Sequence, residues 1–397
     1  MTRPVRFAII GLGVVGARHV QTFRKSRGRD FVLSAAVEIN PKVAEAARSC
    51  LTPDVPVYSS MDELVAAKVC DAVLIAVPHC WHPVLTIQAA RAGLHVLCEK
   101  PLAVTVGPAR AMIAECSRAG VALGAMLQER TLAINVAMKR MIAAGRLGRI
   151  HRISQVATRW YRTQAYYDSG AWRGTWDGEG GGILINQACH ALDVFQWLGG
   201  MPGSVMASVA TRIHDIEVEN TAEALMQYAD GAMGHFYVST AHEPGLDFIE
   251  VFGDKCTLVA MGGKLRLAKL DVPLSRHIKT CKVAEADIAK IGATWMDVKL
   301  PAKTGGSHAD VVAAFAAHLL RGKPMVASGA DAINELELSN AMYISAFANK
   351  AVSLPIDAGE VEKLLDRLEK QRSTGKGNRQ RAKADAALRK LLGSSHT

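Results

Sequence analysis

The sequence has few features that would place a protein in a membrane or an oxidising compartment. No apolar stretch approaches the roughly 20 residues that a membrane-spanning helix needs. The apolar start FAIIGLGVVG is broken by glycines rather than followed by a cleavage site. The eight cysteines form no C-x-x-C pair and do not cluster with histidines at zinc spacing. We therefore expect a globular, cytoplasmic protein with reduced cysteines, no membrane contact and no metal.

Negative charge is scarce at the C-terminal end. The chain carries a net charge of +10, and residues 361–397 hold ten Lys or Arg against four Asp or Glu. Helix-like pieces at about 361–371 and 382–392 are joined by a polar segment. We expect 358–397 to be a basic helical or flexible tail that is solvated or packs on another subunit. Binding to nucleic acid is the alternative, but no motif or interleaved aromatic residue supports it.

Short β-branched apolar runs alternate with helical stretches in the first third of the chain. Such runs suit strands buried on both faces of a parallel sheet, so we predict an α/β, doubly wound Rossmann domain at 1–123. The run HVLCEKP is its last clear strand. Later runs, including RISQVATRWY and GAMGHFYVST, indicate strands with hairpin-like glycine turns. They predict an α+β domain with a mostly antiparallel open sheet at 124–357.

A glycine-rich turn follows the first predicted strand. Gly11, Gly13 and Gly16 form G-x-G-x-x-G at the start of a helix. The first glycine permits a tight turn, and the second lets the backbone approach a pyrophosphate. The helix start, which includes Val14 and Val15, offers oriented N–H groups and a positive dipole end. This pattern predicts a dinucleotide site.

The second predicted strand ends in Glu38, which follows the glycine-rich turn at about the 20 residues typical of a dinucleotide site. An acid here accepts hydrogen bonds from both hydroxyls of the adenine ribose and repels a 2′-phosphate. No Lys or Arg directly follows it to bind such a phosphate. The cofactor is therefore predicted to be NAD rather than NADP.

A charged pair, Glu99 and Lys100, ends the run HVLCEKP. It falls at the carboxyl edge of the sheet, where open α/β sheets bind ligands. One interpretation is a strand that ends in solvated charges and is stopped by Pro101. The other is a lysine aimed at the nicotinamide, where partial desolvation and the positive cofactor ring would lower its pKa toward the range of an acid or base.

A polar stripe in EGGGILINQACHALDVFQWLGG favours the second interpretation. A helical pattern follows glycines 180–182 and ends at Gly199. It places Asn186, His190 and Asp193 at i, i+4 and i+7, on one face of the helix. A single histidine in a helix is more often structural, but the three polar residues together indicate an active-site face.

Four motifs together resemble the Gfo/Idh/MocA oxidoreductase family, named for glucose–fructose oxidoreductase, inositol dehydrogenase and a rhizopine-catabolism protein. They are G-x-G-x-x-G, D-x-V-x-I-x-x-P ending at Pro78, E-K-P at 99–101 and N-Q-x-x-H-x-x-D from Asn186. The likeness extends to about Asp357 and excludes the tail. It implies hydride transfer between NAD(P) and a sugar or cyclitol carbon, in a homodimer or homotetramer that packs through open sheet faces.

The resemblance also implies roles for individual residues. Lys100 would contact the reacting hydroxyl or carbonyl, and His190 would share the acid–base work. Inositol-dehydrogenase-like members have an aspartate four residues before the histidine, but Asn186 cannot ionise. The N-Q-x-x-H version is similar to the subset with nucleotide-sugar 3-dehydrogenases and 3-keto-sugar reductases, in which Asn holds a hydroxyl. Asp193 would orient the imidazole.

Six of the 13 Trp and Tyr residues lie at 160–176. This density suits stacking on a pyranose, with arginines for hydroxyls or an anionic group. The alternative places some of these aromatic residues in the core or at a subunit interface. The candidate substrate contacts here are Arg159, Tyr166, Trp172 and Arg173. Candidate cofactor contacts from other segments are Pro78, His82 and Gln128. Arg130 and His308 are further residues expected to line the site, and His79 and His82 each have either a structural or a functional role.

We predict an NAD-dependent oxidoreductase that oxidises a ring secondary alcohol of a sugar, glycoside, nucleotide sugar or cyclitol. Lys100 and His190 would take the proton. One alternative is an NADPH-dependent keto-sugar reductase. Another is a non-catalytic nicotinamide-binding regulator that keeps the fold without the chemistry.

Overall fold

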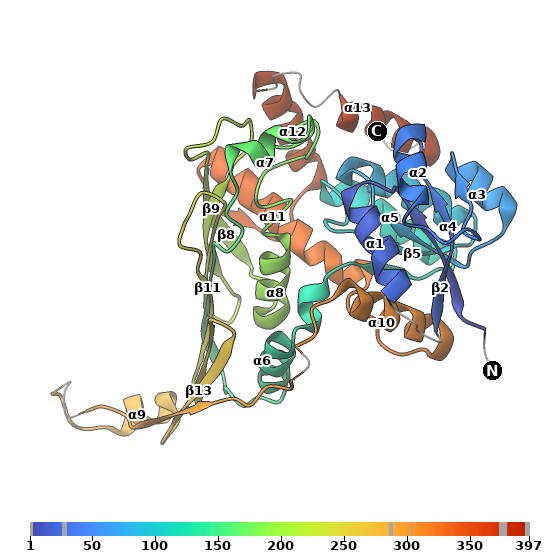
Figure 1. Cartoon of the computed structure of the whole chain (residues 1–397). Helices are drawn as coiled ribbons and strands as arrows, with labels where there is room; N and C mark the ends of the chain where they lie inside the picture. Colours follow the sequence, from blue (N-terminus) through green and yellow to red (C-terminus); the bar gives the residue numbers. More distant parts are fainter. Residues whose placement is uncertain (1–2, 26–29, 286–288, 303, 373–378, 394–397) are drawn as a thin grey trace.

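The N-terminal part of the chain forms a parallel sheet (Figure 1). The strand order is β3-β2-β1-β4-β5-β6, and every neighbouring pair is parallel. The predicted doubly wound architecture is therefore confirmed, and β5, the last clear strand of the sequence pattern, is followed at the edge by the short strand β6. The strands are β1 Val5–Ile10, β2 Phe31–Val37, β3 Val57–Tyr58, β4 Ala72–Ile75, β5 His95–Cys98 and β6 Leu123–Ala125.

The computed structural model describes residues 3–25, 30–285, 289–302, 304–372 and 379–393. Among these residues, no helix combines the length and the hydropathy that crossing a membrane requires.

Helices cover both faces of the first sheet because its strands are apolar on both sides. The ring of Phe7 on β1 packs between those of Phe23 on α1 and Phe315 on α10. α10 comes from the far end of the chain, so one face of the sheet is completed only by a late segment. The opposite face packs on α4 and α5. The helices are α1 Val14–Lys25, α2 Pro41–Arg48, α3 Met61–Ala67, α4 His82–Arg91, α5 Val106–Arg118 and α10 His308–Arg321, and the 3₁₀ helix η1 spans His79–Trp81.

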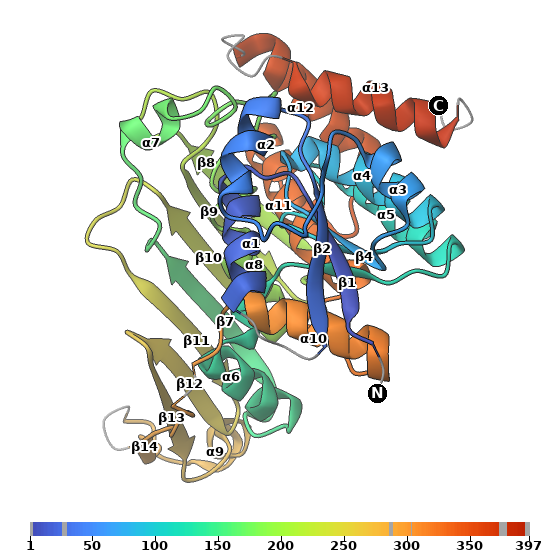
Figure 2. The ribbon, with the colours of Figure 1, turned by 45° about the vertical axis from the view of Figure 1, so that its right-hand side comes forward.

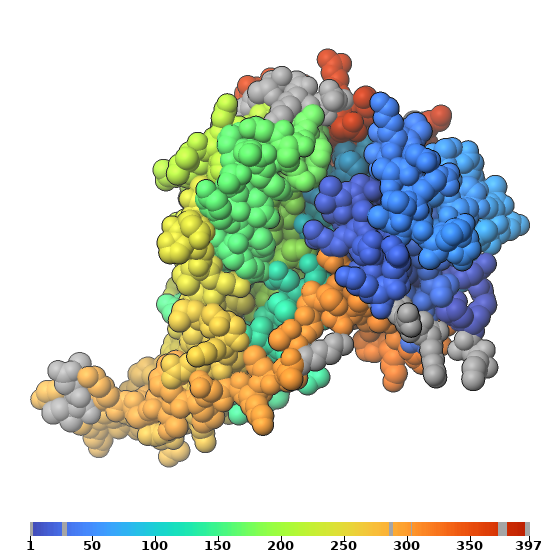
Figure 3. Space-filling model, viewed as in Figure 1, coloured from blue at the N-terminus to red at the C-terminus, as the bar shows by residue number. Residues whose placement is uncertain are grey.

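A second sheet of nine strands has the order β14-β13-β12-β11-β7-β10-β9-β8-β15. All neighbours are antiparallel except β7 and β10, which confirms the predicted mostly antiparallel domain. Helices α6, α8 and α11 lie on the side toward the first sheet (Figure 1). Buried and exposed residues alternate along β9, as expected for a sheet with one open face. The segment around β14 projects from the main body (Figure 3).

The strands of this sheet are β7 Ile150–Ala157, β8 Ser204–Ala210, β9 Thr221–Gln227, β10 Met233–Ser239, β11 Asp247–Gly253, β12 Cys256–Met261, β13 Lys264–Leu270, β14 Ala293–Asp297 and β15 Val352–Ser353. Its helices are α6 Ala133–Ala143, α7 Gln164–Asp168, α8 Cys189–Gly199, α9 Leu274–Thr280 and α11 Gly329–Ala348, and the 3₁₀ helix η2 spans Gln128–Thr131.

The C-terminal tail is a pair of helices that contacts both parts of the molecule (Figure 2). α12 (Ala358–Arg372) packs on α11 and α5, and α13 (Gln380–Leu392) packs on α4 and η1. The carboxylate of Asp177, in the loop before α8, accepts hydrogen bonds from the N–H groups of Gln380 and Arg381 at 3.0 and 3.1 Å. We expected a tail that is solvated or packed on another subunit, but α13 packs on its own chain because one of its faces is apolar.

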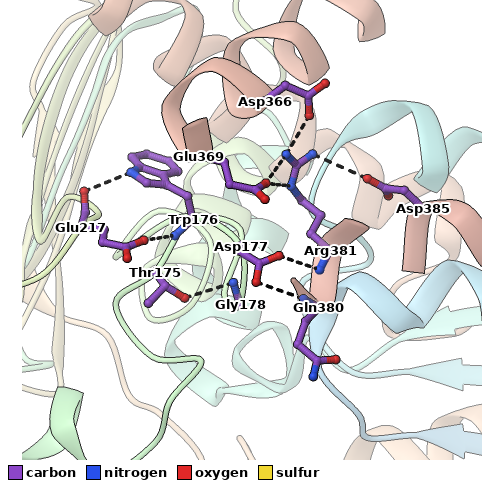
Figure 4. Close-up of polar contacts among 10 residues, drawn as sticks. All are labelled: Thr175, Trp176, Asp177, Gly178, Glu217, Asp366, Glu369, Gln380, Arg381 and Asp385. Atoms are coloured by element: carbon purple, nitrogen blue, oxygen red, sulfur yellow. Dashed lines mark hydrogen bonds and ion pairs between the residues drawn. The ribbon is translucent and has the colours of Figure 1, made fainter. Parts of the chain in front are cut away.

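Arg381 is the central charged contact of the tail (Figure 4). Its guanidinium is buried and donates to Asp366 at 2.7 Å and Glu369 at 2.6 Å, both on α12, and lies 3.7 Å from Asp385. Burial by itself would lower the pKa of Arg381, but these carboxylates outweigh it and the pKa is raised. Part of the basic charge of the tail is therefore used within the tail itself.

The Arg381→Met variant tests this contact. We expect the free energy of unfolding to fall by about 2–3 kcal/mol, below the range for a fully buried ion pair because Asp366 is 56% exposed. Urea unfolding measures the loss, and amide hydrogen exchange should rise across 380–392. The exposed Lys383 on the same helix provides the control, Lys383→Met. Equal stability of the two variants would show that the ion pairs do not hold α13.

Candidate active site

The glycine-rich turn lies between β1 and α1, at the carboxyl edge of the first sheet. Gly11 has a φ of +90°, and a Cβ there would lie 2.6 Å from the carbonyl oxygen of Ala76. A Cβ on Gly16 would lie 1.9 Å from the carbonyl oxygen of Gly11. Gly13 is exposed, with open space around its Cβ position. The first and third glycines therefore shape the turn, and the second leaves its surface open.

Glu38 lies beside this turn at the end of β2. Its carboxylate accepts a hydrogen bond from the N–H of Leu12 at 2.8 Å. Apolar side chains nearby are left uncovered, since Val14 is 75%, Val15 39% and Ile39 83% exposed. An open glycine surface, an acid and uncovered apolar side chains fit the pyrophosphate, ribose and adenine of NAD. These residues would hold the cofactor.

Lys100 joins the end of β5 to the second domain. Its Nζ donates a hydrogen bond to the main-chain carbonyl oxygen of Asn186 at 2.8 Å. We expected desolvation to lower the pKa of Lys100, and burial does act in that direction. The surrounding groups outweigh burial and raise the pKa above its ordinary value; they are Cys189, Glu99, Tyr166 and Glu179. The protein's own groups therefore keep Lys100 as an ammonium ion.

Glu99 points to α1 rather than into the open site. Its Oε1 lies 2.6 Å from Nε2 of His19, and its Oε2 accepts a hydrogen bond from the N–H of Lys100 at 3.1 Å. Burial alone would raise the pKa of this carboxyl, but His19 outweighs burial and the pKa falls to about 2. Possible ligand atoms of His19, Glu99 and His308 lie within 4.8 Å of one another. The sequence spacing indicated no such cluster, and folding creates it. The Glu99 carboxylate of this cluster is already engaged by its contact with His19.

The helix that carries His190 is shorter than predicted. α8 begins at Cys189, and residues 183–188 form turns. Asn186 therefore precedes the helix and does not share a helix face with His190 and Asp193. Backbone geometry and a buried acid explain the difference. Gly180 and Gly181 have φ of +84° and +155°, and Glu219 accepts hydrogen bonds from the N–H groups of residues 182 and 184.

His190 is buried beside Gln128, whose Nε2 lies 3.3 Å from the Nε2 of the imidazole. Burial and the charge of Lys100 lower the pKa of His190 well below its ordinary value, so the ring is neutral. No described residue hydrogen-bonds to its Nδ1. Asp193 does not orient the ring as we expected, because it forms two hydrogen bonds with Arg130 at 2.6 and 2.8 Å.

Part of the aromatic segment faces this region. The hydroxyl of Tyr166 accepts hydrogen bonds from Arg173 at 2.6 Å and from Gln187 at 3.1 Å. The guanidinium of Arg173 lies 4.4 Å from the ring centroids of both Tyr166 and Trp172. The ring of Trp172 lies 6.1 Å from that of His79 on η1. Tyr166, Trp172 and Arg173 are half-buried and combine aromatic surface with one positive charge.

Other predicted substrate residues have structural partners. Tyr167 and Trp176 are each 2% exposed and belong to the core, as the alternative interpretation predicted. Arg159 lies 2.6 Å from both Glu129 and Asp247. Its charge is therefore paired within the second domain.

His82 does not reach the surface of the predicted cofactor site. It is fully buried, and its ring nitrogens lie 2.9 and 3.0 Å from the main-chain carbonyl oxygens of Pro101 and Val77. His82 is the first residue of α4, and this end of the helix is buried. Its two contacts hold the turn after β4 against the loop after β5. Pro78 is exposed at the start of η1.

The sequence analysis missed Glu179. This glutamate is 1% exposed, and its carboxylate accepts hydrogen bonds from the side-chain amide of Asn186 and from the N–H of Gly174. An acid directly before three glycines was visible in the sequence. Nothing in the sequence distinguishes a buried acid from an exposed one at that place.

The arrangement brings together groups in opposite protonation states. Lys100 is a charged donor, and His190 is a neutral ring that can accept a proton. Lys100 binds the main-chain carbonyl oxygen of Asn186, and His190 follows Asn186 by four residues in the sequence. Such a pair can move a proton to or from a hydroxyl while stabilising negative charge on its oxygen.

The variants Gly13→Ala and Gly16→Ala separate the two functions of the glycine-rich turn. Gly16→Ala should lower both thermal stability and NADH affinity, because its Cβ cannot fit against Gly11. Gly13→Ala should keep the unfolding temperature but lower NADH affinity roughly 10-fold or more, since the methyl group occupies the surface that the pyrophosphate approaches. Calorimetric titration and thermal unfolding measure the two effects. Unchanged NADH affinity in Gly13→Ala would contradict this site.

The chain is similar to known proteins in sequence and in structure. An uncharacterised oxidoreductase of Schizosaccharomyces pombe is 28% identical over 227 residues, which cover 57% of this chain and 60% of that protein. A 1,5-anhydro-D-fructose reductase of Ensifer adhaerens is 28% identical over 259 residues, or 64% of this chain and 75% of the relative. The crystal structure of the WlbA dehydrogenase from Bordetella pertussis with NADH and UDP-GlcNAcA is 29% identical, with a TM-score of 0.74 over 89% of this chain and all of that chain.

Family models match each sheet separately. Residues 5–126 match the model described as an oxidoreductase family with an NAD-binding Rossmann fold. Residues 135–259 match the GFO/IDH/MocA C-terminal domain. The two matches follow one another in the order of the two sheets and together cover more than half of the sequence. The chain therefore belongs to the Gfo/Idh/MocA oxidoreductase family, with an NAD-binding Rossmann domain at its N-terminus.

Proposed function

We propose that this enzyme transfers a hydride between NAD and a ring secondary alcohol carbon of a sugar, glycoside, nucleotide sugar or cyclitol, with Lys100 and His190 handling the proton. One observation carries the proposal. The Lys100 ammonium binds the carbonyl oxygen of Asn186, four residues before the neutral ring of His190, and lies at the same carboxyl sheet edge as the NAD-binding turn.

Bound NAD supplies the hydride acceptor. The groups of the chain manage the oxygen and its proton. In oxidation, the neutral His190 accepts the O–H proton, while the ammonium of Lys100 stabilises the developing negative charge on oxygen. In reduction the same steps run in reverse: the Lys100 ammonium polarises the carbonyl, and the protonated ring of His190 returns the proton to the oxygen.

The groups around Tyr166 support a carbohydrate with an anionic part. Tyr166 and Trp172 offer surfaces for a pyranose ring, and Arg173 between them provides a fixed positive charge. Gln187 and Asn186 add amide groups for hydroxyls. The WlbA dehydrogenase, which was crystallised with UDP-GlcNAcA, supports a nucleotide sugar as the first class to test.

Reduction of a keto-sugar is the second candidate direction. The Lys100 ammonium is already charged and can polarise a carbonyl oxygen, and one relative is named as a 1,5-anhydro-D-fructose reductase. Glu38 disfavours a 2′-phosphate, so NADH rather than NADPH is expected to serve. A non-catalytic regulator is less consistent with the presence of both Lys100 and His190.

We further propose that the open face of the second sheet pairs with a second copy of the chain. Met206, Leu225 and Met233 on β8, β9 and β10 are 40%, 62% and 61% exposed. Met206 and Leu225 are cross-strand neighbours. Exposed apolar side chains on one sheet face are typical of subunit interfaces. Light scattering should therefore give the mass of two or four chains.

Lys100→Met tests the catalytic proposal. NADH formation is followed by absorbance with free sugars, cyclitols, glycosides and nucleotide sugars. The variant should lose roughly 100-fold or more in kcat on the class that the wild type oxidises, because it lacks the group that stabilises the oxygen. Lys255→Met, at an exposed position between β11 and β12, is the matched control and should retain activity.

The reverse reaction completes this test. If no alcohol yields NADH, the same panel is offered as keto-sugars with NADH. Turnover there supports the reductive direction of the same site. If calorimetry shows NADH binding but the protein catalyses neither oxidation nor reduction, the enzymatic proposal is wrong and the hypothesis of a non-catalytic regulator remains.

A further inference from the structure

Glu179 is a buried acid that the proposed mechanism does not use. It is 1% exposed, and no lysine or arginine within the described ranges forms an ion pair with it. A buried carboxylate is costly unless hydrogen bonds or charges satisfy it. Glu179 receives only N–H donors, from Gly174 at 2.7 Å and from the side chain of Asn186. A carboxylate kept here at such a cost is a candidate for function.

Asn186 connects this acid to Lys100. The main-chain carbonyl oxygen of Asn186 accepts a hydrogen bond from Lys100 Nζ at 2.8 Å, and its side-chain Nδ2 donates to Glu179. A carboxylate can only accept, so it fixes which end of the amide faces it. The carbonyl oxygen Oδ1 of Asn186 must point the other way. Asn186 is half-buried, and within the described part of the chain nothing donates to this oxygen.

The segment that carries Glu179 is held firmly on both sides (Figure 4). Trp176 donates from its indole Nε1 to the carbonyl oxygen of Glu217 at 3.0 Å. Asp177 binds the N-terminus of α13, and His79 Nδ1 lies 3.3 Å from the carbonyl oxygen of Glu179 itself. The acid is therefore placed by η1, α13 and the second domain together, rather than by a free loop.

We propose that Glu179 is the positioning carboxylate of the active site. It turns the Oδ1 of Asn186 toward a substrate hydroxyl and supplies the negative charge beside Lys100. The carboxylate that an aspartate would provide four residues before His190 is then provided from position 179. This inference rests on the proposed function of Lys100, Asn186 and His190.

The charge state of Glu179 changes near neutral pH. Burial raises its pKa to about 7, although the hydrogen bonds from Gly174 and Asn186 act in the opposite direction. Lys100 and His190 do not titrate there, since the pKa of the first is raised and that of the second is well below its ordinary value. Glu179 is therefore ionised above about pH 7 and protonated below it. The titratable and charged groups that face it are Lys100, Arg173, His79, Tyr167 and Tyr343.

The pH dependence of kcat/KM tests the inference. In the wild type, kcat/KM for alcohol oxidation should fall as the pH drops through about 7, because protonated Glu179 no longer fixes Asn186. Glu179→Gln keeps the size of the side chain but cannot ionise. It should lose roughly 10- to 100-fold in kcat/KM at pH 8 and lack this limb of the profile.

Moving the carboxylate provides a rescue. The double variant Glu179→Gln/Asn186→Asp places the acid at position 186 and should regain at least part of the lost kcat/KM together with an ionisation. Glu219 is the matched control, since it is also buried with a pKa of about 7 but binds the N–H groups of Gly182 and Leu184. Glu219→Gln should lower thermal stability and kcat/KM at every pH, because Glu219 holds the backbone of residues 182 and 184, but it should leave the limb in place.

A second measurement does not depend on turnover. Carbon-13 NMR of protein labelled at the glutamate carboxyl should include one resonance that titrates near 7 and disappears in Glu179→Gln, and a second that titrates near 7 and disappears in Glu219→Gln. Lys100→Met should raise the pKa of the Glu179 resonance, because Lys100 lowers it. The Glu219 resonance should not move.

The outcomes separate the two proposals. A pH limb that persists in Glu179→Gln, or a double variant no better than the single one, overturns the role of Glu179 while Lys100→Met still reports on catalysis. If the wild type turns over no substrate, the proposed function fails. The NMR titration then decides alone, and an unchanged Glu179 resonance in Lys100→Met overturns the inference.

Discussion

The hydrogen bond from Lys100 to the main-chain carbonyl of Asn186 is the contact on which the rest of the site depends. One end is fixed by β5, a strand buried in a parallel sheet. The other end is a backbone group, so its position is set by the path of residues 180–188 rather than by a side-chain rotamer. That path requires glycines with positive φ and the Glu219 carboxylate that binds their neighbours. A site built on main-chain atoms keeps its geometry only if this segment does not become helical.

Buried charges around the site are satisfied in two different ways. Glu99 contacts the ring of His19 and Asp193 binds the guanidinium of Arg130, which engages both carboxylates, although burial still raises the pKa of Asp193. Glu179 and Glu219 receive only N–H or O–H donors, so burial dominates and the pKa of each is raised to about 7. The difference follows from what lies opposite each carboxylate. It leaves one titrating acid, Glu179, next to Asn186 and another, Glu219, bound to the N–H groups of Gly182 and Leu184.

Helices from the C-terminal part of the chain pack against elements formed by its first half. α10 covers the Phe7 face of the first sheet, and α13 lies on α4 and η1 while Asp177 caps it. Because η1 also carries His79, which contacts Trp172 and Glu179, the tail supports the segment that forms the substrate side of the site. A basic tail that looked peripheral is thereby part of the same packed body.

The sequence by itself determined the parallel sheet, the mostly antiparallel second sheet and the NAD-binding turn, because each depends on local periodicity or on glycines at fixed spacing. It also identified Lys100, Asn186 and His190 as residues of interest. It could not place the start of α8, the His19–Glu99 pair, the Arg130–Asp193 pair or Glu179. These depend on contacts between residues far apart in the chain, where burial and the nature of the opposing group decide charge and orientation. Local pattern carries no information about either, so only the tertiary structure decided them.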